Sequence, residues 1–174
     1  MKHRALGTPL AAMAVLAALT GCADLNDTGM AALATRVQAF AIVDEQLVQG
    51  EMTLYTDHTG MVALRAEPTP SNDPAYAASA PKPGGKPVLT SCVGRLRYTA
   101  TTLGVIDLRC NDGAVADLRV ALIGETRGYG YGNTATGLAS LTFGMNAVET
   151  RAHLTVPPGK QLLERMESNG LELR

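Results

Sequence analysis

Apolar and polar residues alternate on either side of a short threonine-rich turn between Cys92 and Cys110. This period of two predicts a pair of antiparallel strands joined as a hairpin. If the turn centres on Thr101, residues whose numbers sum to 202 face each other, so that Leu96 lies opposite Ile106. The same register places the two cysteines opposite each other at the open end of the hairpin, where a cross-link between strands is sterically reasonable.

The hairpin pattern occurs twice in the chain. Residues 50–65 match residues 94–109 at a constant offset of 44, with a glycine at the start of each half and apolar residues at alternate positions after it. The second half recurs over residues 137–141. We interpret this as a repeated hairpin unit, in which glycine lets a strand start from a tight turn and alternate residues face the core. Chance similarity between alternating strands is the competing explanation.

The other alternating segments extend the same meander. Residues 37–43 are partly apolar on both faces, and we expect Phe40 in the core. Asn111-Asp112-Gly113 is a turn signal, after which residues 114–123 alternate between one apolar and one polar face. Residues 137–143 form the return strand. The sequence therefore predicts a mainly β fold: a small antiparallel meander of repeated hairpins, arranged as a sandwich or partly open barrel, with a short C-terminal helix.

The end of the chain allows two structures. Apolar residues recur at helical spacing between Lys160 and Glu167, which predicts a short helix, and residues 171–173 then predict a last strand. Asn169 followed by Gly170 would stop that helix, but the same pair is also a favoured hairpin turn. This segment is therefore expected to be either a helix or part of a hairpin.

The segment Gly128–Gly132 alternates glycine with tyrosine. In a strand, its three glycines lie on one face and Tyr129 and Tyr131 on the other. A face without side chains permits close approach of another backbone, a tight bend at a barrel corner, or a flat surface for a ligand. The tyrosines form our candidate binding surface, which would stack a sugar or grip a protein. The alternative is that they pack on the sheet with their hydroxyl groups at its rim.

The first residues of the chain predict the cellular compartment of the protein. A positively charged start, residues 1–4, precedes an apolar run over residues 6–19 that contains no acid and is too short to span a bilayer comfortably as a helix. The run ends in Leu19-Thr20-Gly21-Cys22, which resembles the lipobox of bacterial lipoproteins. The resemblance implies that residues 1–21 are a lipoprotein signal peptide and that Cys22 becomes the acylated first residue of the mature chain. An ordinary secretory signal with a chance cysteine is the alternative.

The same resemblance implies a location. The residue after Cys22 is alanine rather than aspartate, which favours lipid anchoring in the outer membrane, at its periplasmic face or at the cell surface. The whole chain, including the block at 92–110, resembles proteobacterial lipoproteins of unknown function. Residues 22–35 are expected to form a tether, and residues 36–174 a single β-rich domain with a disordered Pro/Ala-rich loop at 67–87.

The charge and cysteine content of the chain limit the kinds of partner it is expected to bind. Without the signal peptide, 153 residues remain with 13 basic and 16 acidic side chains, a formal charge of −3. No basic stretch survives, which argues against nucleic-acid binding, so the expected partners are the membrane, through the acyl chains, and an envelope protein. With one of the three cysteines consumed by lipid, we expect a Cys92–Cys110 disulfide in an oxidising compartment. A zinc site is the rival, but His58 and His153 lack the clustered spacing of such sites.

The sequence carries no motif for catalysis: no nucleophile elbow, Cys/His pair or His-rich metal motif is present. No motif supports a catalytic dyad of Ser140 and His153. Asp107 and Asp117 fall on the polar faces of predicted strands, and His58 falls in a predicted turn. We therefore expect no catalytic residue, metal or cofactor, and a non-catalytic structural or interaction module of the cell envelope. The alternative is a lipoprotein that binds a small ligand or inhibits a hydrolase. This alternative rests only on the chain's similarity in size and construction to small, disulfide-containing β lipoproteins that inhibit hydrolases.

Overall fold

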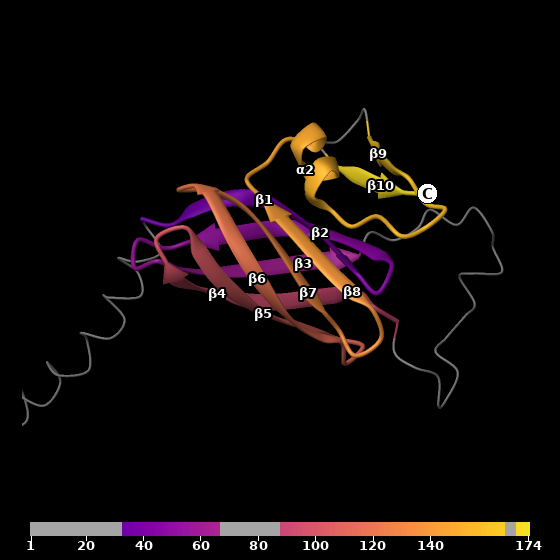
Figure 1. The fold of residues 1–174 in the computed structure, drawn as a ribbon, viewed down its shortest axis with the longest axis horizontal. Coiled ribbons are helices and arrows are strands. Elements are labelled where there is room, and N and C mark those ends of the chain that lie inside the picture. Colours follow the sequence, from indigo (N-terminus) through magenta and orange to yellow (C-terminus); the bar gives the residue numbers. More distant parts are fainter. Residues whose placement is uncertain (1–32, 67–87, 166–169) are drawn as a thin grey trace, which may run out of the picture. The chain divides into compact units, whose positions relative to one another are not determined.

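The structure is a computed structural model that describes residues 33–66, 88–165 and 170–174. Eight antiparallel strands follow one another around a closed barrel, and the last pairs with the first (Figure 1). The strands of the barrel are β1 (Thr35–Val43), β2 (Gln46–Leu54), β3 (Thr59–Ala66), β4 (Ser91–Ala100), β5 (Leu103–Cys110), β6 (Val115–Gly124), β7 (Arg127–Asn133) and β8 (Leu138–Phe143). The predicted meander is confirmed, and it closes completely. The predicted signal peptide, most of the tether and the loop at 67–87 lie outside the described residues.

Alternate residues of the strands fill the barrel interior, because successive side chains of a strand point to opposite faces. β6 shows the predicted pattern: Ala116, Leu118, Val120 and Leu122 are buried, and the residues between them face outward. Fully burying a side chain such as Leu118 stabilises the fold by about 1.5–3 kcal/mol. A register slip of one residue would move this entire set to the wrong face, so the apolar pattern fixes the register.

The β4–β5 hairpin has the predicted register. Leu96 lies opposite Ile106 and Cys92 lies opposite Cys110, and the structure joins the two cysteines by a disulfide. After Tyr98 the ladder shifts, so that the turn contains two residues rather than centring on Thr101. The disulfide thus cross-links the two strands at the end opposite the turn.

The repeated hairpin unit is also confirmed. Gly50 of β2 lies opposite Leu64 of β3, just as Gly94 lies opposite Leu108. The expected role of these two glycines was wrong, however, since both lie within strands rather than at turns. A Cβ atom on Gly50 would come within 2.1 Å of the Ala63 carbonyl oxygen, so glycine is needed where neighbouring backbones approach closely.

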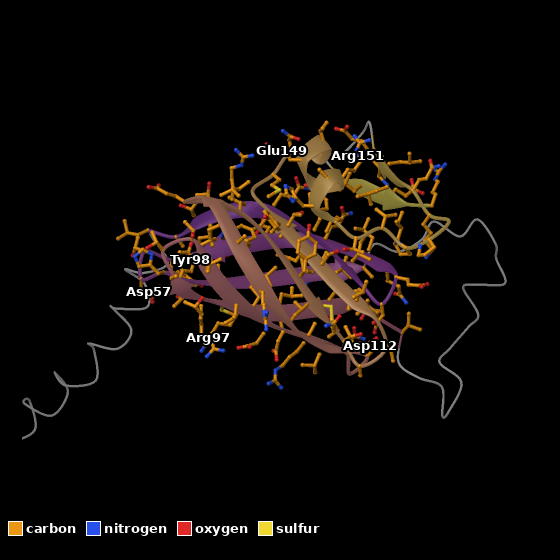
Figure 2. All side chains as sticks on the ribbon, viewed as in Figure 1. Asp57, Arg97, Tyr98, Asp112, Glu149 and Arg151 are labelled. Atoms are coloured by element: carbon orange, nitrogen blue, oxygen red, sulfur yellow. A yellow bond between two sulfur atoms is a disulfide. The ribbon has the colours of Figure 1, made fainter. Side chains whose placement is uncertain are left out.

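Polar side chains hold the turns. Asp57 Oδ1 accepts hydrogen bonds from the Thr59 backbone N–H at 3.0 Å and hydroxyl at 2.6 Å, and the hydroxyl bond is the main reason that the pKa of Asp57 is lowered. His58 is an exposed residue of this turn, as predicted. At the other end of the barrel, Asn111 Oδ1 accepts from the N–H groups of Thr90 at 2.7 Å and Ser91 at 2.9 Å, which fixes the chain where it enters β4. Asp57 and Asp112 mark these two ends in Figure 2.

The helix does not lie where it was predicted. It is α2 (Ala147–His153), whereas β9 (Leu162–Glu164) pairs with β10 (Leu171–Leu173) as the hairpin alternative required. The helix predicted over residues 160–167 is wrong, because Leu162–Glu164 form a strand of this hairpin, in which Leu162 is buried and Leu163 is exposed. Residues 166–169 lie outside the described residues. Asn146 caps the N-terminus of α2: its side chain accepts from the Glu149 N–H while the Glu149 carboxylate accepts from the Asn146 N–H, which is a capping box.

This C-terminal segment builds a second core on the outside of the barrel. Phe40 and Ile42 point outward from β1 and are buried by apolar residues that follow β8. The covering residues are Leu154, Leu162 and Leu171. The predicted apolar character of both faces of β1 is therefore real, because one face lines the barrel and the other lies under the C-terminal segment (Figure 1).

Removing the disulfide should destabilise the barrel. Replacing Cys92 and Cys110 together by alanine frees a loop with a sequence separation of 18, which we expect to cost about 3 kcal/mol in the chain-entropy model. Urea denaturation of the two proteins measures the difference. As a control, thiol labelling of the denatured, unreduced natural protein should modify neither cysteine, and modification of both would contradict the cross-link.

Candidate functional site

The glycines of β7 face the barrel interior and its tyrosines face outward, as the alternation predicted. Gly128 and Gly130 are buried. A Cβ atom on Gly128 would lie 2.6 Å from Cζ of Phe143 and 2.9 Å from the Ala121 carbonyl oxygen, so the Phe143 ring occupies the space that a side chain would need. The glycine face is therefore a packing face and does not form a flat surface for a ligand.

The two tyrosines of the candidate binding surface have different environments. The Tyr129 ring stacks on His153 of α2, with ring centroids 4.1 Å apart and an interplanar angle of 14°. Tyr131 meets Tyr129 edge-on at 5.6 Å and remains 42% exposed. Partial burial is the main reason that the pKa of Tyr131 is raised, with a smaller contribution from Tyr129. Tyr129 thus packs against the C-terminal helix, and Tyr131 is the tyrosine available to a partner.

Tyr131 borders an open groove of about 590 Å³ on the outer wall of the barrel. The groove lies where the β6–β7 ladder ends, at the pair Arg119 and Tyr131. Its lining also includes Asp117 and Asn133, with Leu138 at one side. A guanidinium group, a carboxylate, an amide and an aromatic ring thus converge on one hollow. This combination can stack a planar group and exchange hydrogen bonds with it.

Tyr131 is the one residue of this groove that the sequence predicted to contact a partner. The lining comes from four strands, and no local motif connects Arg119, Asn133 and Leu138. Their proximity follows from the β6–β7 and β7–β8 registers, which become known only when the whole barrel is assembled.

Ser140 and His153 do not form a dyad in the described structure. The Ser140 side chain is buried and its Oγ accepts a hydrogen bond from the Thr155 N–H at 3.0 Å, whereas His153 stacks on Tyr129. Among residues 33–66, 88–165 and 170–174, no three His, Cys, Asp or Glu side chains are grouped to hold a metal ion. His58 lies beside the Tyr98 ring, 5.3 Å between centroids.

The remaining predicted sites lie elsewhere. Cys22 is outside the described residues. Cys92 is buried and its disulfide serves the fold. Within the described part of the chain, none of the helices has the length and apolar character needed to cross a bilayer.

Comparison with known proteins yields little. No protein-family model matches the chain, and a search of curated proteins finds no match. Among solved structures, a redesigned β-barrel is similar to it at 16% sequence identity and a TM-score of 0.42, over 66% of this chain and 93% of the redesigned protein.

The close contact at Gly128 is testable by adding one methyl group. Gly128→Ala should lower the free energy of unfolding by about 1–3 kcal/mol, because the new Cβ would overlap the Phe143 ring and the Ala121 carbonyl. Gly124→Ala is the matched control, since the nearest atom to a Cβ there lies 3.9 Å away, and we expect a change within about 0.5 kcal/mol. Urea denaturation of both variants measures the effect; equal effects would contradict the proposed packing role.

Proposed function

We propose that this protein is a lipid-anchored protein of the outer membrane that acts as a non-catalytic structural or interaction module of the cell envelope. The observation that carries the proposal is Leu19-Thr20-Gly21-Cys22, which directly follows an apolar run with a charged start. Acyl chains on Cys22 would hold the protein on a membrane, because each buried CH₂ group contributes about 0.8 kcal/mol.

The fold is consistent with this location. Disulfides persist mainly in oxidising compartments such as the periplasm, and the structure has one between β4 and β5. Closure of the barrel pairs both edges of the sheet, which protects an envelope protein from edge-to-edge aggregation. These features support the proposed compartment without specifying an activity.

The groove beside Tyr131 supports an interaction role. Tyr131 is exposed while its neighbour Tyr129 is fixed against His153, so the groove has one free aromatic ring on a rigid strand. Aromatic and arginine side chains of this kind often dominate binding energy at protein interfaces. Binding of a small ligand, or inhibition of a hydrolase, is the alternative function, and it would use the same groove.

The anchoring proposal predicts a specific mass. The full chain, expressed in a Gram-negative host and extracted from membranes, should begin at Cys22 and carry acyl chains that intact-protein mass spectrometry detects. Cys22→Ser should abolish the added mass and leave the protein out of the lipid-anchored membrane fraction. A natural chain that is cleaved without any acyl modification would contradict the anchor.

The interaction proposal predicts cross-linking at the groove. A photoreactive residue at Tyr131 should give a discrete protein adduct in cells, whereas one at Ile123, which is also exposed on the outer wall, should not. Mass spectrometry of the adduct would identify the partner. A folded, anchored protein that gives no adduct at Tyr131 would contradict the interaction module and favour a ligand or a purely structural role.

A further inference from the structure

A basic surface lies on the outer side of three neighbouring strands. We name it the arginine wall, and it comprises Arg95 and Arg97 of β4, Asp107 and Arg109 of β5, and Asp117 and Arg119 of β6. The strand register brings these residues together, since Arg95 lies opposite Asp107 and Asp107 lies opposite Asp117. Four guanidinium groups therefore surround two carboxylates, and the wall carries a formal charge of +2.

Most of this positive charge has no partner in the described structure. Arg97 pairs with Asp107 at 2.7 Å. Arg95, Arg109 and Arg119 form no ion pair with any residue of the described ranges. The arginines of the C-terminal segment differ, because all of those that the structure describes pair with glutamates. Three of the five arginines that have no ion pair within the described ranges therefore belong to the wall, and the other two are Arg36 of β1 and Arg65 of β3.

The surrounding surface is apolar rather than acidic. Val93 and Val115, which flank Arg109 on its two neighbouring strands, are 56% and 49% exposed. Met61 lies opposite Arg95 and is 47% exposed. Guanidinium groups among exposed aliphatic side chains suit the boundary between lipid headgroups and acyl chains, where charge attraction and apolar burial act together.

The wall is on the side of the barrel that the C-terminal segment leaves uncovered. In the strand order, β4 and β5 lie across the barrel from β8 and β1, on which α2 and the second core are built (Figure 1). Arg97 projects outward from that uncovered side in Figure 2. The wall is thus accessible to a large flat partner.

We propose that the arginine wall docks on the phosphate headgroups of an anionic membrane surface. Arginine matches phosphate well because its planar fork donates two parallel hydrogen bonds. The charges occupy three strands, about 10 Å across, rather than one line, so a surface of many phosphates satisfies them better than a single extended acidic peptide. The proposal builds on the proposed anchor, because the twelve residues between Cys22 and Thr35 span at most about 40 Å and would keep the barrel close to the membrane.

The test uses a chain that begins at Ala23 and therefore has neither the signal nor the lipidated cysteine. All strands of the described ranges and both cores lie within residues 35–174, so this chain retains the complete barrel. In sedimentation assays it should bind vesicles of phosphatidylglycerol mixed with phosphatidylcholine, should not bind vesicles of phosphatidylcholine alone, and should dissociate as salt is added. The protein's disulfide and circular dichroism spectrum verify that each variant is folded.

A matched pair of variants separates the wall from net charge. Arg95→Gln, Arg109→Gln and Arg119→Gln together should weaken vesicle binding about 100-fold, at about fivefold for each arginine. Arg151→Gln, Lys160→Gln and Arg174→Gln remove the same charge from the C-terminal segment. This control should change binding less than about twofold.

Three outcomes would overturn the proposal: no binding to anionic vesicles at low salt, equal loss in the two triple variants, or binding of soluble polyglutamate through the wall without binding of vesicles. The last would reassign the wall to an acidic protein partner. Failure of the anchoring proposal can be told apart from failure of the wall proposal. If the natural chain carries no acyl groups but the chain that begins at Ala23 still binds anionic vesicles, only the anchor is contradicted.

Discussion

The pairing of β1 with β8 is the interaction on which the rest of the structure depends. Five residue pairs, Ala39 to Val43 with Phe143 to Ala139, turn an open meander into a barrel and leave neither edge of the sheet unpaired. The same stretch of β1 is buried on both faces. Ala39, Ala41 and Val43 line the interior, and Phe40 and Ile42 hold the C-terminal segment. Disruption of β1 would therefore open the barrel and release the second core together.

A carboxylate links two turns at one end of the barrel. Asp44 accepts hydrogen bonds from the hydroxyl groups of Thr134 and Thr136, the second at 2.6 Å, which links the β1–β2 turn to the β7–β8 turn. Asp44 and Glu45 both have positive φ, 44° and 68°, as a two-residue type I′ hairpin requires. Neither is glycine, so this turn stores some backbone strain that the threonine contacts offset.

Local alternation was sufficient to predict the β4–β5 register, because each strand has one clearly apolar face and a shift of one residue would reverse it. The pattern also identified the two equivalent hairpins. It could not show closure, because β1 and β8 are about 100 residues apart in sequence and no local signal connects them. The helix was misplaced for a related reason. Leucines at 162 and 163 suggested a helical face, but the outer surface of β1 selects only one of them.

The candidate site was only partly predictable. The alternation of glycine and tyrosine indicated which face of β7 bears side chains, and the structure agrees. That Tyr129 is covered by His153 and Tyr131 is not depends on where α2 packs, and that position depends on tertiary contacts such as the ion pair between Arg127 and Glu149. The groove was not predictable either, because its lining residues come together only when the β5–β6, β6–β7 and β7–β8 ladders are all in register.

The two sides of the barrel use outward-facing positions in opposite ways. On β1 and β8 these positions are buried by the C-terminal segment, whereas on β5 and β6 they carry charged side chains, including Asp107 directly opposite Asp117. Like charges opposite each other destabilise a sheet, so the surrounding arginines are needed to offset the repulsion. The two carboxylates in turn attract the guanidinium groups and hold them close to the surface of the strands. Because the wall contains four arginines and two aspartates, it keeps a net positive charge. An external anion can supply the negative charge that the fold lacks there.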